Sequence, residues 1–322
     1  MASPMTGRAD SFPAMPAICL IGAPADAGAG LRGTRMGPDA LRVAGLARVL
    51  RGQGYPVIDA GNLVAPRASE CRHDRSHPPA STAPHHLCEV VAWNRSVFQS
   101  VAAALARGEL PLVMGGDHSL AIGSISAVAA HCRRVGKRLR VLWFDAHADA
   151  NTESTSPSGN LHGMPVACLL GVGPAALVGW GDSPAALHPA QLALIGLRSI
   201  DPQEKALIEQ LGLEVYDMRY VDEHGMRATV DRALHGLGSD SHLHLSFDVD
   251  VLDPRDAPGV GTPVPGGPSF REMQLCMNRI ANCAGLGSLD LMELNPARDL
   301  RGRTAKAAVL LMRELFAQSP RH

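Results

Sequence analysis

Residues 145–149, with the sequence DAHAD, carry a potential metal ligand at every second position. Asp145, His147 and Asp149 follow the apolar run 141–144, which has the composition of a buried strand. Side chains two positions apart in an extended segment point to the same face, so these three side chains are expected to converge. The segment therefore predicts a cation-binding group at the end of a strand.

Similar residues follow three other apolar segments. They are Asp117 and His118 in GGDHS, Asp248 and Asp250 in SFDVD, and Glu293 in MELNP. Because the carboxyl ends of parallel strands meet at one edge of a sheet, these side chains are expected to gather there. Any one motif alone has an ordinary interpretation: a DxD on a loop, a hydrogen-bonded core histidine, or a glutamate that caps the next helix. Together they indicate metal, because carboxylates massed in a dry crevice repel one another unless cations neutralise them.

The number of donors indicates two ions rather than one. Two imidazoles and four carboxylates exceed the ligands of a tetrahedral zinc site, and no cysteine accompanies them. Mixed oxygen and imidazole donors suit Mn²⁺. Carboxylates can bridge two ions about 3.5 Å apart. Ions held in this way would lower the pKa of a bound water enough for it to act as hydroxide near neutral pH.

Eight apolar segments of strand length recur along the chain, and the interpretation of the fold depends on them. Most are followed by stretches of helical period, such as 38–53 and 94–108, which is the pattern of parallel β/α units. No internal repeat is present. The candidate strands are 17–22, 55–59, 110–115, 140–144, 192–197, 213–216, 242–247 and 288–292.

Residues 64–86 break this rhythm, being rich in Pro, Ser and His. We interpret them as an irregular surface loop whose histidines, His73, His77, His85 and His86, are solvated, since no acidic cluster accompanies them. The expected organisation is an N-terminal tail at 1–15 and a single catalytic domain at 16–319.

Composition limits the classes of binding partner and the cellular compartment that are expected for this protein. Lys and Arg number 30 against 31 Asp and Glu, so no basic excess favours nucleic acid or anionic membrane. The 7 cysteines are scattered without a CxxC pair, which is typical of a reducing compartment. Without a signal peptide or membrane-spanning segment in the sequence, we expect a cytoplasmic protein.

The chain resembles the ureohydrolases, and within them the arginase family. The segments that carry the resemblance are IGAPADAGAGLRGTRMGPDALR, GGDHS, DAHADANTESTSPSGNLHGMPVA, IGLRSIDPQEK, HLSFDVDVLDP, GVGTPVPGG and LDLMELNP. The resemblance implies a three-layer α/β/α sandwich with a parallel eight-stranded sheet, two Mn²⁺ per chain, and a homo-oligomer, either a trimer or a hexamer. It implies hydrolysis of L-arginine to L-ornithine and urea by a metal-bridging hydroxide.

The resemblance also implies roles for individual residues. Glu293 would bind the guanidinium, Asp149 would deliver a proton to the departing amine, and His162 would shuttle protons to and from solvent. One ion would be held by His118, Asp145, Asp149 and Asp248, and the other by Asp145, His147, Asp248 and Asp250, with Asp145 and Asp248 bridging.

Substrate choice depends on the polar loop after DAHAD. By resemblance, Asn151, Ser158 and Asn160 face the α-carboxylate of the substrate, Asp201 and Glu204 face its α-ammonium, and Thr262 is a further substrate-side residue. A site that pairs these groups penalises a substrate that lacks them. The loop therefore favours arginine over agmatine, which has no α-carboxylate.

Three alternatives remain at this point. An agmatinase or another guanidino-compound ureohydrolase would share the metal ligands. A non-catalytic metal-binding regulatory protein would normally have lost a ligand or a proton-handling residue, and none is missing here. A deacetylase-like zinc hydrolase shares the general architecture but not this pattern of six ligands.

Overall fold

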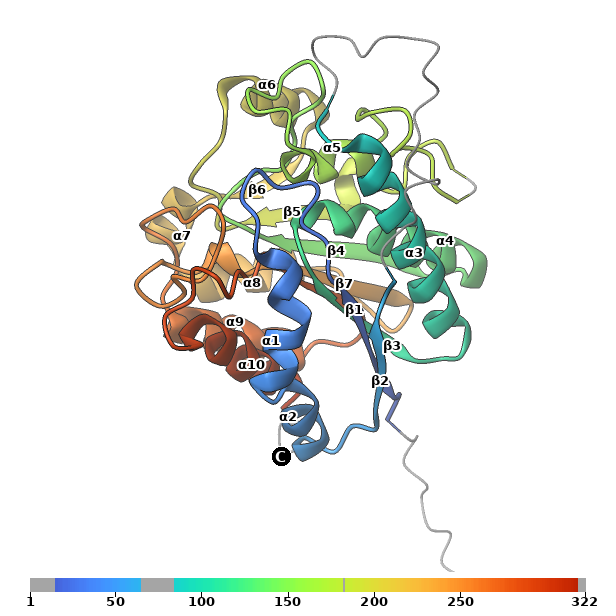
Figure 1. The fold of residues 1–322 in the computed structure, drawn as a ribbon, viewed down its shortest axis with the longest axis vertical. Helices are drawn as coiled ribbons and strands as arrows, with labels where there is room; N and C mark the ends of the chain where they lie inside the picture. The colour runs from blue at the N-terminus through green and yellow to red at the C-terminus, as the bar shows by residue number, and fades with distance from the viewer. Residues whose placement is uncertain (1–14, 65–83, 182, 318–322) are drawn as a thin grey trace, which may run out of the picture.

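The computed structural model describes residues 15–64, 84–181 and 183–317 (Figure 1). The expected N-terminal tail, apart from residue 15, lies outside the described residues. So do most of the 64–86 loop, including His73 and His77, and the last two residues of the expected domain.

One parallel sheet of eight strands forms the centre of the molecule, in the order β2-β1-β3-β8-β7-β4-β5-β6. Each predicted strand is present, and the predicted fold class is confirmed. The strands are β1 (Ile18–Ala23), β2 (Val57–Asn62), β3 (Leu110–Gly115), β4 (Arg138–Phe144), β5 (Leu192–Ile195), β6 (Glu214–Tyr216), β7 (Ser241–Asp248) and β8 (Leu286–Met292).

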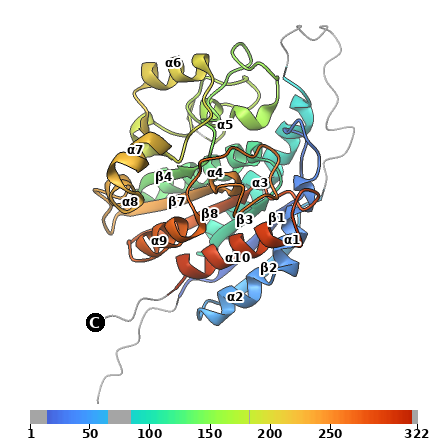
Figure 2. The ribbon, with the colours of Figure 1, turned by 90° about the vertical axis from the view of Figure 1, so that its left-hand side faces the viewer.

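Helices cover both faces of this sheet (Figures 1 and 2). The α-helices are α1 (Gly37–Val43), α2 (Leu46–Gly52), α3 (Leu87–Ala106), α4 (Ala121–Val135), α5 (Pro165–Leu169), α6 (Pro202–Leu211), α7 (Met218–His224), α8 (Met226–Ala233), α9 (Phe270–Ala281) and α10 (Arg303–Leu315). Short 3₁₀ turns are η1 (Thr34–Met36), η2 (His118–Leu120), η3 (Leu161–Gly163), η4 (Pro189–Gln191) and η5 (Val249–Val251).

The structure divides one of the two predicted helical stretches and lengthens the other. Residues 38–53 form two helices rather than one, because Gly45 adopts φ 91° and interrupts the helix between α1 and α2. The stretch 94–108 falls within α3 for all but its last two residues, and this helix begins seven residues earlier, at Leu87.

The sheet separates two apolar cores. Helices α1, α2, α7, α8, α9 and α10 pack on one face, and α3, α4, α5 and α6 pack on the other. Alternation along β4 divides its side chains between them: Leu142 and Phe144 enter the first core, whereas Val141 and Trp143 enter the second. Both faces of the central strands are buried, so their carboxyl ends are the accessible place for polar residues.

No helix among the residues that the structure describes is long and apolar enough to span a membrane.

Candidate metal and substrate site

Four adjacent strands, β3, β8, β7 and β4, bring the predicted ligands to one edge of the sheet. A tight turn follows two of these strands and is stabilised by the aspartate at its start. Asp117 is the N-cap of η2 and accepts a hydrogen bond from Ser119 N at 3.1 Å, whereas Asp248 is the N-cap of η5 and accepts one from Asp250 N at 2.7 Å. These caps supply hydrogen-bond acceptors for backbone amides in the two turns, where the strand ladder no longer pairs them.

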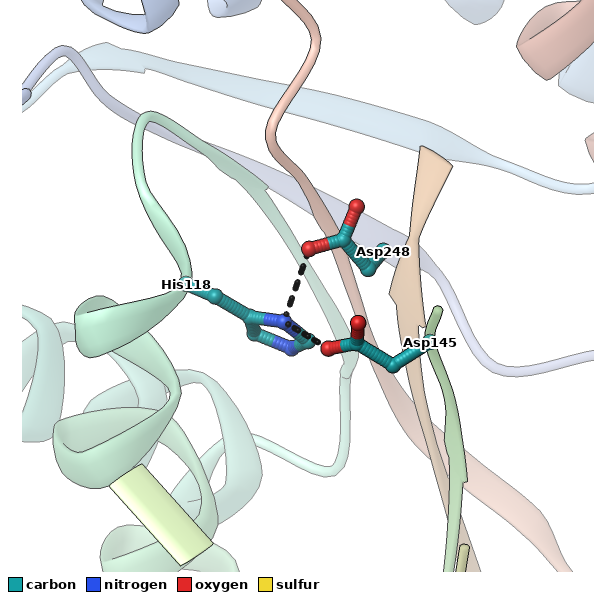
Figure 3. A group of neighbouring side chains, drawn as sticks. All are labelled: His118, Asp145 and Asp248. Carbon is teal, nitrogen blue, oxygen red and sulfur yellow. Dashed lines mark hydrogen bonds and ion pairs between the residues drawn. The ribbon is translucent and has the colours of Figure 1, made fainter. Parts of the chain in front are cut away.

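The first group of donors surrounds His118. Its Nδ1 contacts Asp145 and Asp248 (Figure 3). The distances from Nδ1 are 3.0 Å to Asp145 Oδ2, 3.1 Å to Asp248 Oδ2 and 3.5 Å to Asp149 Oδ2. All four side chains are buried. The imidazole is oriented by Ser246, whose hydroxyl lies 2.9 Å from His118 Nε2.

The second group surrounds His147. Its Nδ1 lies 3.1 Å from Asp250 Oδ2 and 3.4 Å from Asp145 Oδ1. Asp145 thus reaches both groups, one with each oxygen, as expected of a bridging carboxylate. Asp248 lies within ligand distance of His118 and Asp145 but does not belong to the group around His147. Its other oxygen, Oδ1, accepts the Asp250 amide.

The electrostatics of the cluster favour a bound cation. Burial and repulsion from neighbouring carboxylates raise the pKa of Asp149 and Asp248 well above the usual range. Burial would lower the pKa of His147, but hydrogen bonds and charges from Asp145 and Asp250 outweigh it and raise the pKa to about 12. The residues fit a pair of divalent ions, because oxygen and imidazole donors without thiolates suit hard cations.

Backbone strain is concentrated here. Asp149 has φ 50° and Glu293 has φ 62°, in the left-handed region that non-glycine residues rarely adopt. Two of the four such residues in the described chain therefore belong to this cluster. Strain of this kind persists where the surrounding structure enforces it, and it tends to mark functional positions.

A cavity of about 130 Å³ opens beside the cluster. Its walls bring together five of the six predicted substrate-side residues, Asn151, Ser158, Asp201, Glu204 and Thr262, with the predicted proton shuttle His162. The predicted ligands His147, Asp149, Asp248 and Asp250 form the metal-side wall. Asn160 does not line this cavity. Its amide lies against Gly30, with Nδ2 2.7 Å from the point that a Cβ of Gly30 would occupy.

Several of these side chains have structural partners as well. Asp201 is the N-cap of α6. Glu204 accepts from the backbone amides of Asp201 and Ala150 at 3.0 and 2.9 Å, so both its oxygens are engaged. Asn151 donates from Nδ2 to Asp201 Oδ2 at 3.0 Å. Thr262 donates to Asp250 Oδ2 at 3.0 Å. Glu204 therefore anchors the loop around the cavity, and Thr262 orients a predicted ligand.

Glu293 does not line this cavity, but it contacts His162, which does. Its Oε1 accepts the His118 amide at 2.9 Å and lies 3.2 Å from His162 Nδ1, whereas its buried Oε2 has no hydrogen-bond partner among the described residues. Burial lowers the pKa of His162, but the hydrogen bond and charge of Glu293 raise it by more, so the net pKa is raised. A buried carboxylate oxygen without a partner is costly and is ready to accept from a cationic ligand.

Some residues of the site were not identified from the sequence. Trp143 donates from Nε1 to Asp145 Oδ2 at 3.0 Å, and Ser246 contacts His118. Each lies two residues before a predicted ligand, Asp145 or Asp248. Since alternate residues of a strand share a face, the alternation that predicted the ligands could also have identified these two residues. Ser156, Pro157, Gly163 and Ser199 complete the cavity wall.

A parallel α/β sheet with buried carboxylates and imidazoles at its carboxyl edge defines a class of metal-dependent hydrolases. Comparison with known proteins narrows this class. Residues 16–317 match the model of the Arginase family, and the chain belongs to that family.

Individual relatives agree with this assignment. The chain is 41% identical over 305 residues to an arginase of Bacillus caldovelox, covering 94% of this chain and 99% of that protein. The crystal structure of an arginase from Bacillus subtilis superposes with a TM-score of 0.84 at 39% identity, covering 94% of this chain and 99% of that one. A structure described as a hypothetical agmatinase from Burkholderia thailandensis is more distant, with a TM-score of 0.68 at 27% identity, covering 94% and 85%.

Proposed function

We propose that the protein is an arginase, which hydrolyses L-arginine to L-ornithine and urea with two Mn²⁺ per chain. The observation that carries this proposal is the unpartnered, buried Oε2 of Glu293, whose other oxygen contacts both the ligand His118 and His162, a residue that lines the small polar cavity. A guanidinium cation supplies the charge and the N–H donors that this oxygen lacks. The greater similarity to arginases than to the agmatinase also supports the choice of substrate.

The metal ligands of the proposal are those expected from the sequence. One ion would be held by His118, Asp145, Asp149 and Asp248, and the other by Asp145, His147, Asp248 and Asp250. Bound Mn²⁺ would supply hydroxide near neutral pH by lowering the pKa of its water.

Glu293 would orient the substrate. A guanidinium is planar, cationic and resonance-stabilised, so its carbon must be held at a fixed angle to the nucleophile. Charge-assisted hydrogen bonds from the substrate to Oε2 would fix that angle. Since Oε1 is held by the His118 amide, the carboxylate is itself fixed in position before substrate enters.

Proton transfer is the next requirement, because the departing amine must be protonated before it can leave. We assign this step to Asp149, whose side chain lines the cavity and contacts the cluster. His162 would exchange protons with solvent, since its side chain is 19% exposed while that of its partner Glu293 is 2% exposed.

Specificity for an amino acid would arise at the outer wall of the cavity. Asn151 and Ser158, with Asn160, would receive the α-carboxylate, and Asp201 would face the α-ammonium, with Glu204 and Thr262 holding the surrounding wall. Agmatine would not offer Asn151 and Ser158 the carboxylate that arginine brings to their remaining hydrogen-bond donors, which is the basis of discrimination. We further propose that residues 16–319 act as one domain in a cytoplasmic homo-oligomer.

The test is urea release by the Mn²⁺-loaded protein from arginine, agmatine and 4-guanidinobutyrate at equal concentrations, with metal content measured on the same preparation. We expect two ions per chain and a preference for arginine of at least about 100-fold in kcat/KM. Asp145→Ala serves as the control, and it should lose both metal and activity. A preference for agmatine, or a fully loaded protein inactive on all three guanidines, would reject the proposal.

A further inference from the structure

We infer that Asp117 is a positioning residue for His162 and acts through the backbone N–H and C=O of Gly28. The inference rests on the proposed function in one respect only, the catalytic role of His162. The geometry that links the three residues is independent of that role.

Asp117 is a buried carboxylate that does not line the cavity beside the cluster and is not a predicted metal ligand. It is 0% exposed, and its two oxygens have separate tasks. Oδ1 accepts from the amide and the hydroxyl of Ser119, which shapes the turn after β3. Oδ2 accepts from the amide of Gly28 at 2.9 Å, across 89 residues of sequence. Only the second contact leaves the local turn.

Gly28 transmits this contact to His162. Its carbonyl accepts the His162 amide at 3.0 Å, so one residue joins the carboxylate on one side to the proton-shuttle residue on the other. The His162 amide belongs to the first turn of η3, where amides have no partner within the helix. The Gly28 carbonyl therefore determines where η3, and with it the imidazole, lies.

No other residue type fits at position 28. A Cβ there would lie 2.5 Å from Asp117 Oδ1 and 2.6 Å from Ser119 Oγ, closer than real Cβ atoms approach. The absence of a side chain lets the backbone of Gly28 approach the carboxylate closely. This is the reason for glycine here, and it does not depend on a special φ angle.

A second route joins the same two residues. His162 Nδ1 contacts Glu293 Oε1, which accepts the amide of His118, the residue that follows Asp117. The contacts thus form a closed ring through Asp117, Gly28, His162, Glu293 and His118. A ring of this kind fixes the imidazole from both its backbone and its ring nitrogen. Breaking the Gly28 link leaves only the ring contact, so the imidazole should lose its fixed orientation toward the cavity.

Three variants test this inference. Asp117→Ala removes the acceptor for the Gly28 amide. Asp117→Asn restores an acceptor oxygen without the charge. Ser119→Ala is the matched control, because it removes a donor to the other carboxylate oxygen and leaves the Gly28 contact intact. Two quantities are measured on Mn²⁺-loaded protein of verified metal content: arginine kinetics, and amide hydrogen exchange of the segments 26–33 and 160–163.

We expect Asp117→Ala to lower kcat at least tenfold with KM changed by less than twofold, and to accelerate exchange in both segments at least fivefold. Asp117→Asn should recover most of kcat and of the protection, and Ser119→Ala should behave as the wild type. Wild-type exchange and kcat in Asp117→Ala would overturn the inference. An Asn variant as impaired as the Ala variant would also overturn it, since the charge rather than the acceptor would then matter.

If Asp117→Ala does not fold, Gly28→Ala tests the link from its other side. Its Cβ displaces the peptide from Asp117, and we expect the same loss of kcat and of protection at 160–163. Unchanged exchange there would overturn the inference. A wild-type protein without arginase activity would reject the proposed function instead, and the exchange measurements would still decide whether Asp117 holds His162.

Discussion

The imidazole of His118 lies flat on the indole of Trp143, with ring centroids 3.9 Å apart and planes 9° from parallel. The same indole donates from Nε1 to Asp145 Oδ2 at 3.0 Å. One side chain thus orients two predicted ligands, one by stacking and one by a hydrogen bond. Groups that hold ligands in this way tune metal affinity even though they never touch the metal.

Trp143→Phe separates these two effects. Phenylalanine keeps an aromatic face under His118 but removes the donor to Asp145. We expect the dissociation constant for Mn²⁺ to rise about tenfold to 100-fold, with kcat at saturating metal changed much less. Calorimetric titration of metal-free protein with Mn²⁺ measures the constant. Trp93→Phe, a buried tryptophan of α3 outside the site, is the control. Equal affinity in the wild type and Trp143→Phe would contradict the role assigned to the indole.

Glu293→Gln should separate activity from stability. The amide keeps an acceptor for the His118 amide but loses the charge that pairs with a guanidinium. We expect kcat/KM for arginine to fall at least about 100-fold, since a hydrogen bond to a charged group contributes about 1.5–3 kcal/mol and the bound substrate loses its orientation. The free energy of unfolding should change much less than the activity, because the amide keeps the contact with the His118 amide and the buried Oε2 that is replaced has no hydrogen-bond partner among the described residues.

Steady-state kinetics and urea denaturation of the same preparations make this comparison. Glu272→Gln, a helix-capping glutamate at the start of α9, is the control for a loss of charge outside the site. A variant that keeps kcat/KM within threefold of the wild type would show that Glu293 does not bind the substrate cation.

Asn151 and Asn160 should differ in their effect on specificity. Asn151 lines the cavity and is oriented by Asp201, whereas the side chain of Asn160 packs against Gly30. We expect Asn151→Ala to raise KM for arginine about tenfold or more and to leave agmatine turnover almost unchanged, because only arginine has a carboxylate to lose. Asn160→Ala should raise KM for arginine less. Urea release with both substrates measures the difference, and equal losses in the two variants would contradict the ranking.

The central strands could be predicted from sequence because they are buried on both faces and consist of continuous apolar runs. The edge strand β2 was placed less well, at 55–59 rather than Val57–Asn62. Its last four residues, 59–62, contain no large apolar side chain, and most of this edge strand is exposed, so hydrophobicity gives no signal there. The predicted metal ligands could be identified because they are charged residues directly after buried apolar strands, where burial of a charge costs free energy unless it has a partner.

Other features of the site depend on tertiary contacts that no local pattern encodes. The left-handed backbone at Asp149 and Glu293 is enforced by the packing around them, and neither residue type predicts it. The link from Asp117 to His162 passes through a backbone amide and a carbonyl, which every residue has. The packing of Asn160 against Gly30 likewise requires two loops far apart in the chain to meet.

His242 should make the protein sensitive to acid, independently of the site. It lies on β7 and is 5% exposed, with Nε2 2.8 Å from the Ser288 hydroxyl. Burial, with smaller contributions from His244, His131 and Lys137, lowers its pKa to about 3. In the unfolded chain a histidine binds its proton near pH 6.5, so between pH 6.5 and 3 the unfolded state holds one proton more than the folded state.

Stability therefore falls as the pH is lowered through this range, and His242 alone should cost about 2 kcal/mol at pH 5 relative to pH 7. His242→Leu removes the titrating group, while Ser288 keeps its contact with His244. Urea denaturation at pH 7 and pH 5 should show a smaller loss of stability in this variant than in the wild type. His235→Leu, at an exposed histidine, should lose as much as the wild type does. If His242→Leu loses as much stability as the wild type between the two pH values, His242 is not the group that senses acid.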